Sequence, residues 1–255
     1  MSPLEAVLVT LAGVAAGTIN TVVGSGTLIT FPTLLALGLP PVTANVSNTI
    51  GLVPGSVSGS IGYRRELAGQ QPRLLRLGSA SVLGGVTGAV LLLVLPAEAF
   101  DAIVPVLIGL GCVLVLVQPR ISAAMAARAE RRGEQPPEHG ALWVWVLVFL
   151  AGIYGGYFGA AQGVILLALL GIFIVDDLQR LNGVKNVLAT IANGVAAIVF
   201  VFAAHVVWEV AALIAVGSVV GAQFGAHYGR RLPAPVLRVV IVVVGVVAAV
   251  RLLAT

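Results

Sequence analysis

Charge is scarce in this sequence. Only 9% of its 255 residues are charged, whereas soluble globular domains usually have about 25%. Hydrophobic residues make up 59%, and the mean hydropathy is +1.08. A chain of this composition cannot cover a water-facing surface, so we expect lipid to surround most of it. This excludes an ordinary soluble domain and predicts a protein embedded in a lipid bilayer.

Cysteine and the usual catalytic motifs are also scarce or missing. The single cysteine, Cys112, excludes an intrachain disulfide, and its apolar neighbours in the sequence indicate a small core residue. The three histidines lie far apart and have no metal-ligand spacing. There is no Walker A, CxxC or HExxH motif, so neither ATP hydrolysis nor zinc chemistry is indicated. We therefore expect no catalytic residues, no metal and no cofactor.

Long charge-free runs are present instead. No Asp, Glu, Lys or Arg occurs within 6–63, 139–175 or 186–208. A membrane-spanning helix needs about 20 such residues. The N-terminus has no basic region ahead of its apolar run, so we interpret it as the first membrane segment rather than a removed signal peptide. The predicted apolar segments are 4–22, 26–39, 44–62, 77–95, 101–118, 141–158, 162–175, 183–205, 210–228 and 234–251.

One polar stretch divides the chain into two halves. We expect 119–140 to be a cytoplasmic linker between an N-terminal transmembrane repeat, 1–118, and a C-terminal transmembrane repeat, 141–255. Three short patterns recur in the same order in both halves, which indicates an internal repeat. They are Ala12, Gly13, Gly17 and Gly24 with Ala151, Gly152, Gly156 and Gly163; Asn45, Val46, Thr49 and Ile50 with Asn186, Val187, Thr190 and Ile191; and Gly84, Val86, Gly88 and Ala89 with Gly217, Val219, Gly221 and Ala222.

The arginines indicate how the halves are oriented. Loop 63–76 and linker 119–140 are rich in arginine, which marks both as cytoplasmic and does not require a nucleic-acid partner. Loop 205–209, which corresponds to 63–76, has no arginine or lysine. The acidic loop 96–101 corresponds to the basic stretch 229–233. Corresponding loops therefore fall on opposite sides of the membrane, which makes the repeats inverted and places both termini outside the cytoplasm.

The predicted fold is an all-α polytopic membrane protein with two inverted-topology repeats. Each repeat contains a Gly-interrupted helix pair followed by three transmembrane helices. The second member of each pair, 26–39 or 162–175, is short for a span. The sequence leaves open whether these two segments span fully or form re-entrant hairpins, and it does not indicate an oligomeric state.

Glycine-rich turns interrupt the apolar segments at matching places. "GTINTVVGSG" joins the first two segments, and "GGYFGAAQG" joins the sixth and seventh. Irregular backbone survives in lipid only against protein or a water-filled cavity, because each unpaired backbone group costs several kcal/mol. Breaks at matching positions of inverted halves are typical of transporter binding sites, and freed helix N–H groups suit an anion. Close helix packing by small residues is the alternative. The candidate substrate-binding residues in the turns are Asn20, Thr21, Gly24, Ser25, Gly26, Gly159, Gln162 and Gly163.

The third segment of each half adds polar side chains. Asn45, Asn48 and Thr49 lie three and four residues apart, so they share one helix face. Amide side chains in a membrane also form hydrogen bonds between helices, which is the alternative role for the asparagines. The equivalent candidates in the second half are Asn186, Thr190 and Asn193.

The only lysine, Lys185, is a further candidate. It lies just inside a predicted span, where an ionisable residue usually has a function. The alternative is a lysine whose side chain reaches the cytoplasmic surface beside Asp176, Asp177 and Arg180.

Most of the chain resembles the TauE/SafE sulfite exporter family. The stretches that carry the likeness are "TLITFPTLLALGLPPVTANVSNTIGLVPGSVSGSIGYRR", "GYFGAAQGVILLALLGIF" with "LNGVKNVLATIANGVAAIVF", and "GSVVGAQFGAHYGRRLPAPVLRVVIVVV". The first glycine run, "VVGSG", is less dense than in many relatives. The resemblance implies transport of small anions, such as sulfite, sulfoacetate or other organosulfonates, across the bacterial inner membrane.

These features predict a secondary transporter that holds a sulfite-type anion between the two turns and moves it by alternating access. A proton could travel on the anion, since sulfite protonates close to neutral pH, and the sequence leaves proton coupling and the direction of transport open. A passive anion channel and a non-transporting membrane scaffold are the alternatives.

Overall fold

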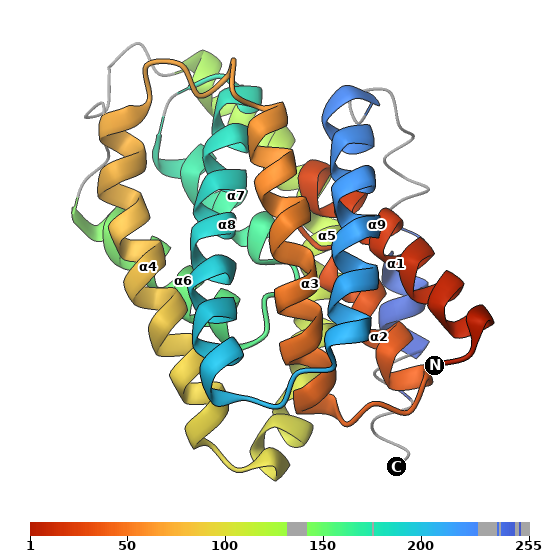
Figure 1. The fold of residues 1–255 in the computed structure, drawn as a ribbon. Helices are drawn as coiled ribbons and strands as arrows, with labels where there is room; N and C mark the ends of the chain where they lie inside the picture. The colour runs from red at the N-terminus through yellow and green to blue at the C-terminus, as the bar shows by residue number, and fades with distance from the viewer. Residues whose placement is uncertain (132–141, 175, 229–238, 240, 248–249, 251–255) are drawn as a thin grey trace.

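The structure, a computed structural model, describes residues 1–131, 142–174, 176–228, 239, 241–247 and 250. Over these residues it is helical and contains no β-strand, which confirms the predicted all-α class. Figure 1 shows the helices packed side by side in one bundle. The labelled helices are α1 (Pro3–Val22), α2 (Thr27–Ala36), α3 (Pro41–Gly62), α4 (Gln71–Val94), α5 (Ala97–Arg131), α6 (Leu142–Tyr157), α7 (Gln162–Phe173), α8 (Leu178–Ala203) and α9 (Trp208–Tyr228).

Polar residues in the sequence set the starts of two of these helices. Ser2 and Glu5 form a capping box at α1: Ser2 Oγ accepts from Glu5 N at 3.3 Å, and Glu5 Oε2 accepts from Ser2 N at 2.8 Å. At α8, Asp177 Oδ1 accepts from the backbone N–H groups of Gln179 and Arg180. Helix α8 therefore begins five residues before the predicted segment 183–205, and Lys185 lies about two turns inside it.

The arginine-rich regions are more helical than predicted. Arg73 lies in the first turn of α4, not in a loop. Helix α5 continues to Arg131, through part of the predicted linker 119–140. The rest of that linker lies outside the described residues. Half of the predicted tenth segment, 234–251, also lies outside the described residues, and the other half is helical. Arg230, Arg231 and Arg238 lie outside them too.

Five helices of the described chain are long and apolar enough to cross a membrane, namely α1, α4, α5, α8 and α9. Helices α2 and α7 have 10 and 12 residues, so at 1.5 Å per residue they extend about 15 and 18 Å. That is about half of the roughly 30 Å hydrocarbon core. Neither crosses alone, which favours the re-entrant hairpin over two full spans. The more polar α3 packs against α1, α8 and α9.

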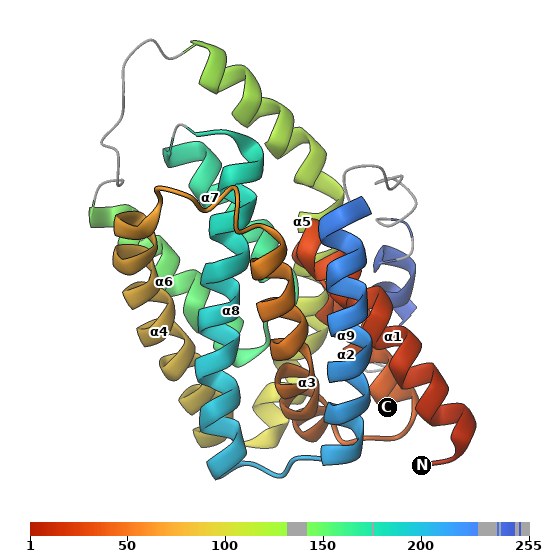
Figure 2. The same cartoon turned by 45° about the horizontal axis from the view of Figure 1, so that its top comes forward.

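The two halves exchange packing partners. Helix α1 packs against α9, and its counterpart α6 packs against α4. In the same way α3 packs against α9, and its counterpart α8 packs against α4, while α3 and α8 pack against each other. Figures 1 and 2 show that α3 and α8 run in opposite directions, as do α4 and α9. Inverted repeats require this arrangement, and the full relation of the halves stays a prediction.

The recurring glycines explain this packing. Gly13 of α1 faces Gly217 of α9, and a Cβ built on Gly13 would lie 3.3 Å from the Gly217 Cα. In the other half Gly152 of α6 faces Gly84 of α4, and a Cβ on Gly152 would lie 3.1 Å from the Gly84 Cα. Small residues let membrane helices approach this closely. Helix packing, the alternative stated above, is therefore the role of these four glycines.

Candidate functional site

The two helix breaks touch each other at the centre of the bundle. Helix α1 ends before Gly24 and α2 begins just after it, while Gly163 lies at the start of α7. Gly163 N donates to Gly24 O at 3.0 Å. Gly24 has φ +91°, and a Cβ built on it would lie 2.5 Å from the Gly163 Cα. Both interruptions predicted from the sequence are thus present, and glycine is required where they cross.

A small hollow lies beside this crossing, between the two halves. It is lined by residues of both helix breaks and of the two central helices α3 and α8. The lining residues are Asn20, Thr21, Gly24, Ser56, Gly163, Lys185, Asn186 and Ala189.

Lys185 brings the only lysine side chain of the sequence to the hollow. Its side chain is fully buried, with 0% of the residue exposed. Nζ donates to the carbonyl oxygens of Asn20 at 3.4 Å and Thr21 at 3.3 Å. These carbonyls belong to the last turn of α1, where the helix dipole favours a cation. The side chain does not extend to the surface, which was the alternative stated above. No carboxylate of the described residues forms an ion pair with Nζ.

Two equivalent asparagines hold the broken helices together. Asn186 Nδ2 donates to Thr21 O, in the last turn of α1, at 3.4 Å. Asn45 Nδ2 donates to Tyr157 O, the last residue of α6, at 2.9 Å. Each asparagine thus pairs a carbonyl at the end of the first helix of the other half. Such carbonyls have no partner within their own helix, so the two bonds satisfy backbone groups that the breaks expose.

Part of the predicted amide chemistry is already used inside the protein. Gly26 N donates to Asn20 Oδ1 at 3.4 Å, and Gly163 N donates to Gly24 O. Buried N–H groups are nearly always paired, and these two backbone N–H groups are paired within the turns. These two amides are therefore not free donors for a ligand in the hollow.

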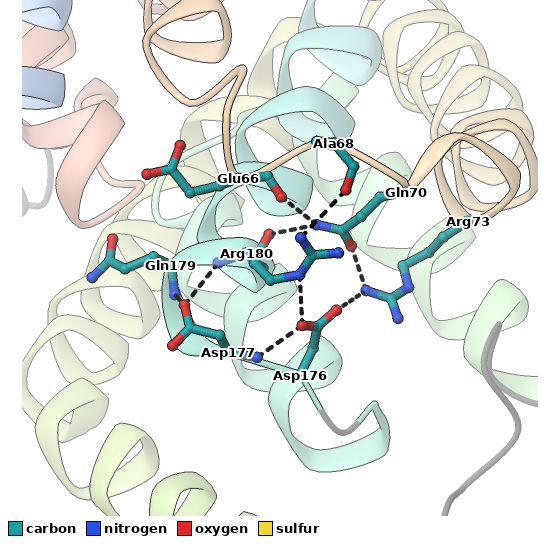
Figure 3. Close-up of polar contacts among 8 residues, drawn as sticks. All are labelled: Glu66, Ala68, Gln70, Arg73, Asp176, Asp177, Gln179 and Arg180. Atoms are coloured by element: carbon teal, nitrogen blue, oxygen red, sulfur yellow. Dashed lines mark hydrogen bonds and ion pairs between the residues drawn. The ribbon is translucent and has the colours of Figure 1, made fainter.

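A charged cluster joins the two halves near one end of α8 (Figure 3). Asp176 Oδ2 lies 2.6 Å from Arg73 Nη1, and Asp176 Oδ1 lies 2.8 Å from Arg180 Nε. Burial by itself raises the pKa of the Asp176 carboxyl. The hydrogen bonds from Arg73 and from the Asp177 N–H, with the two arginine charges, outweigh burial and lower that pKa below its usual value. We call Arg73, Asp176 and Arg180 the arginine–aspartate cluster.

Further bonds connect the loop between α3 and α4 to the start of α8. Gln70 Nε2 donates to Arg180 O at 3.4 Å, and Arg180 Nη1 donates to Ala68 O at 3.3 Å (Figure 3). Asn182 Nδ2 donates to Tyr63 Oη at 2.8 Å. Asn182 lies about one turn before the hollow-lining lysine. The contacts between the halves therefore continue from this end of the bundle to the hollow.

A family model described as "Sulfite exporter TauE/SafE" matches residues 9–252. The chain belongs to the sulfite exporter TauE/SafE family. This confirms the resemblance found in the sequence, and with the five long apolar helices it makes the chain a multi-pass membrane transporter of the TauE/SafE family. No solved structure matches the chain.

Relatives of this TauE/SafE chain have transporter names. The "Probable membrane transporter protein ORF9" of Sinorhizobium sp is 28% identical over 246 residues, covering 96% of this chain and 90% of its own. The "Probable membrane transporter protein YfcA" of Escherichia coli strain K12 is 24% identical over 254 residues, with 99% and 91% covered. A "Probable membrane transporter protein" of Haemophilus influenzae is 25% identical over 214 residues, with 84% and 81% covered.

The hollow of this TauE/SafE chain contains some of the predicted site residues and not others. Asn20, Thr21, Gly24, Gly163, Lys185 and Asn186 line it. Most of the others bond between neighbouring segments: Asn48 with Thr27 and Thr30 of α2, Thr190 with Ser60 of α3, and Asn193 with Gln162. The predicted residues that lie outside the lining are Ser25, Gly26, Asn45, Asn48, Thr49, Gly159, Gln162, Thr190 and Asn193.

Sequence reasoning missed two lining residues. Ser56 lies about two turns after Thr49 on α3, so it continues the polar face that begins at Asn45. That spacing was a usable signal. Ala189 is apolar and lies about one turn after Lys185. Its chemistry marks no site, so it is found only once the hollow is seen.

Proposed function

We propose that this protein is a secondary transporter that moves a small anion, of the sulfite or organosulfonate type, across the bacterial inner membrane by alternating access. One observation carries the proposal: Lys185 is a fully buried lysine that has no carboxylate partner among the described residues and lines a hollow between the two halves. A buried charge is costly unless it is paired. A bound anion supplies the missing partner.

The hollow offers neutral donors next to the ammonium. Asn20 Nδ2 donates to Ser56 Oγ at 3.3 Å, and Asn186 Nδ2 donates to Thr21 O. An amide nitrogen carries two hydrogens, so each asparagine keeps one hydrogen beyond the bond just described. A small oxyanion has several acceptor oxygens around one centre. It therefore matches an ammonium flanked by two amides better than an apolar or cationic solute does.

Alternating access requires contacts between the two halves that can break and form again. Arg73 belongs to the first half, and Asp176 belongs to the second. Arg180 follows Asp176 in the same half and also pairs with it. When Arg73 moves away, Asp176 keeps one arginine partner and is not left unpaired. The arginine–aspartate cluster therefore suits a contact that forms and breaks during transport.

The arginine content of loop 63–76 supports a cytoplasmic location for this end of the bundle and a location outside the cytoplasm for both termini. A protonated anion would carry its own proton through the hollow. In that way transport is linked to protons without an acidic residue in the lining.

The test is flux in proteoliposomes that contain the purified chain. Loaded sulfite should accelerate the uptake of external sulfite, because a carrier shows counterflow, and flux should saturate. Lys185→Gln should reduce flux by more than about tenfold, while Ser218→Ala, a buried hydroxyl on α9 away from the hollow, should not. Flux without saturation or counterflow indicates a passive channel. No anion flux from correctly folded protein indicates a non-transporting scaffold, and either result overturns the proposal.

A further inference from the structure

We infer that the hollow selects oxyanions that carry a single negative charge and discriminates against dianions. The inference rests on the proposed function, because it concerns the same hollow, and it adds the charge state of the ligand.

The first argument is the charge of the hollow itself. Its lining residues other than Lys185 are neutral. Four helices contribute to the lining: α1, α3, α7 and α8. Their other charged side chains are Glu5, which bonds to Ser2 N in the first turn of α1, and Arg180, which pairs with Asp176. One positive charge therefore faces the ligand.

Two more helices, α4 and α6, pack against α8 without lining the hollow. The Arg73 guanidinium on α4 is committed to Asp176, and the Tyr154 hydroxyl on α6 donates to Ala160 O. These groups add no free charge to the hollow. The ionisable residues of α4 and α6 are Arg73, Arg76, Tyr154 and Tyr157.

The second argument is electrostatic. A monoanion beside Lys185 makes the occupied hollow neutral. A dianion leaves one uncompensated negative charge in a fully buried site, where charge is far more costly than in water. The ligand stays in this low-dielectric environment while it is transported. The same penalty therefore weakens the binding of a dianion and slows its transport.

The third argument is the number of donors. The Lys185 ammonium has three N–H groups, and two of them are directed to the carbonyl oxygens of Asn20 and Thr21. Beyond these bonds, one N–H of the ammonium and one N–H of each amide, Asn20 and Asn186, are left for a ligand. Three donors match the three oxygens of a sulfonate or hydrogensulfite group. They are few for a sulfate dianion, which carries four strongly hydrated oxygens.

The decisive measurement is a binding series on the purified full-length protein at constant ionic strength. The probes are methanesulfonate, sulfite and sulfate, with sulfoacetate as an organic dianion. At pH 6, methanesulfonate and sulfite should raise the melting temperature, and sulfate and sulfoacetate should bind at least about tenfold more weakly. From pH 6 to pH 8 the Kd of sulfite should rise relative to that of methanesulfonate by about tenfold, because only the singly protonated fraction of sulfite binds.

Dividing the Kd of sulfite by the Kd of methanesulfonate at each pH cancels the effect of titrating the protein itself. Ser56→Lys adds a second cation to the lining and should bring the affinity for sulfate close to that for methanesulfonate. Gln71→Lys adds the same charge at an exposed position of α4 and should leave the preference unchanged. Should Ser56→Lys fail to fold, the series on the natural chain still decides. Dianions that bind as tightly as monoanions overturn this inference alone, whereas binding of no anion overturns the proposed function.

Discussion

Gly24 lies at the point where the two helix breaks touch, so a side chain there is expected to be costly. In Gly24→Ala the new Cβ would lie 2.5 Å from the Gly163 Cα, in a backbone conformation with φ +91°. Left-handed backbone costs an L-residue about 1–2 kcal/mol, and overpacking adds about 1–3 kcal/mol. We expect the free energy of unfolding to fall by more than about 2 kcal/mol, measured by denaturation in detergent.

Gly38 is the matched control for this substitution. Its φ is +83°, but a Cβ built on it has nothing within 4 Å. Gly38→Ala should therefore cost only the backbone strain, about 1–2 kcal/mol. An equal decrease in the free energy of unfolding for the two variants would show that the two helix breaks are not tightly packed where they cross.

Single residues also show what sequence could and could not predict. The importance of Lys185 was visible, because it is the only lysine in an apolar chain. The burial of its side chain could not be predicted. It depends on the start of α8 at Asp177 and on carbonyl groups of α1 that are distant in sequence. The same holds for Asn45 and Asn186: their type was informative, but their bonds to the opposite half became visible only in the structure.

At the scale of helices, Asn45 and Asn186 make a test pair. Each Ala variant removes one bond to a carbonyl at the end of a broken helix. Asn45→Ala leaves the buried Tyr157 carbonyl unpaired, which costs about 1–3 kcal/mol. In Asn186→Ala the Thr21 carbonyl keeps its bond from Lys185, so that variant loses one hydrogen bond, worth about 0.5–1.5 kcal/mol. Both variants should therefore melt earlier. Only Asn186 lines the hollow. We therefore expect Asn186→Ala, and not Asn45→Ala, to weaken the stabilisation by sulfite at pH 6, measured by thermal shift. An equal loss of that stabilisation in both variants would contradict the assignment of the hollow.

The arginine–aspartate cluster predicts a stability change in acid. Asp176 has a lowered pKa in the folded protein, so its contribution is fully present above its unfolded pKa of about 3.9. It is lost as the pH falls through the lower folded pKa. Between pH 7 and pH 3 the melting temperature of the natural chain should therefore fall, and it should fall less in Asp176→Asn. Asp101→Asn, an exposed carboxylate on α5 outside the cluster, is the control and should show the same fall as the natural chain.

At the scale of the whole molecule, the sequence predicted the all-α class and most segment positions, whereas the inverted repeat stays a prediction. The sequence did so because close helix packing needs small residues at fixed intervals, and Gly13, Gly84, Gly152 and Gly217 satisfy that need in both halves. The same composition hid the site. Glycines that pack helices and glycines that border a hollow look alike in sequence, and only its place in the lining of the hollow separates Gly163 from the packing glycines.

The last prediction concerns how the molecule opens. If the cluster keeps the cytoplasmic end closed, Arg73→Gln should favour the state in which the hollow opens to that side. A cysteine at Ser56 reports this, in a chain whose buried Cys112 is replaced by alanine.

A membrane-impermeant thiol reagent applied to inverted vesicles should label the Ser56→Cys variant several-fold faster when Arg73→Gln is present. Arg64→Gln removes the same charge from an exposed position outside the cluster and should leave the rate unchanged. Faster labelling only from the outer face would reverse the proposed orientation. Unchanged labelling from both faces would mean that the halves do not part at the cluster, because freeing Asp176 from its cross-half partner would then have no effect on access to the hollow.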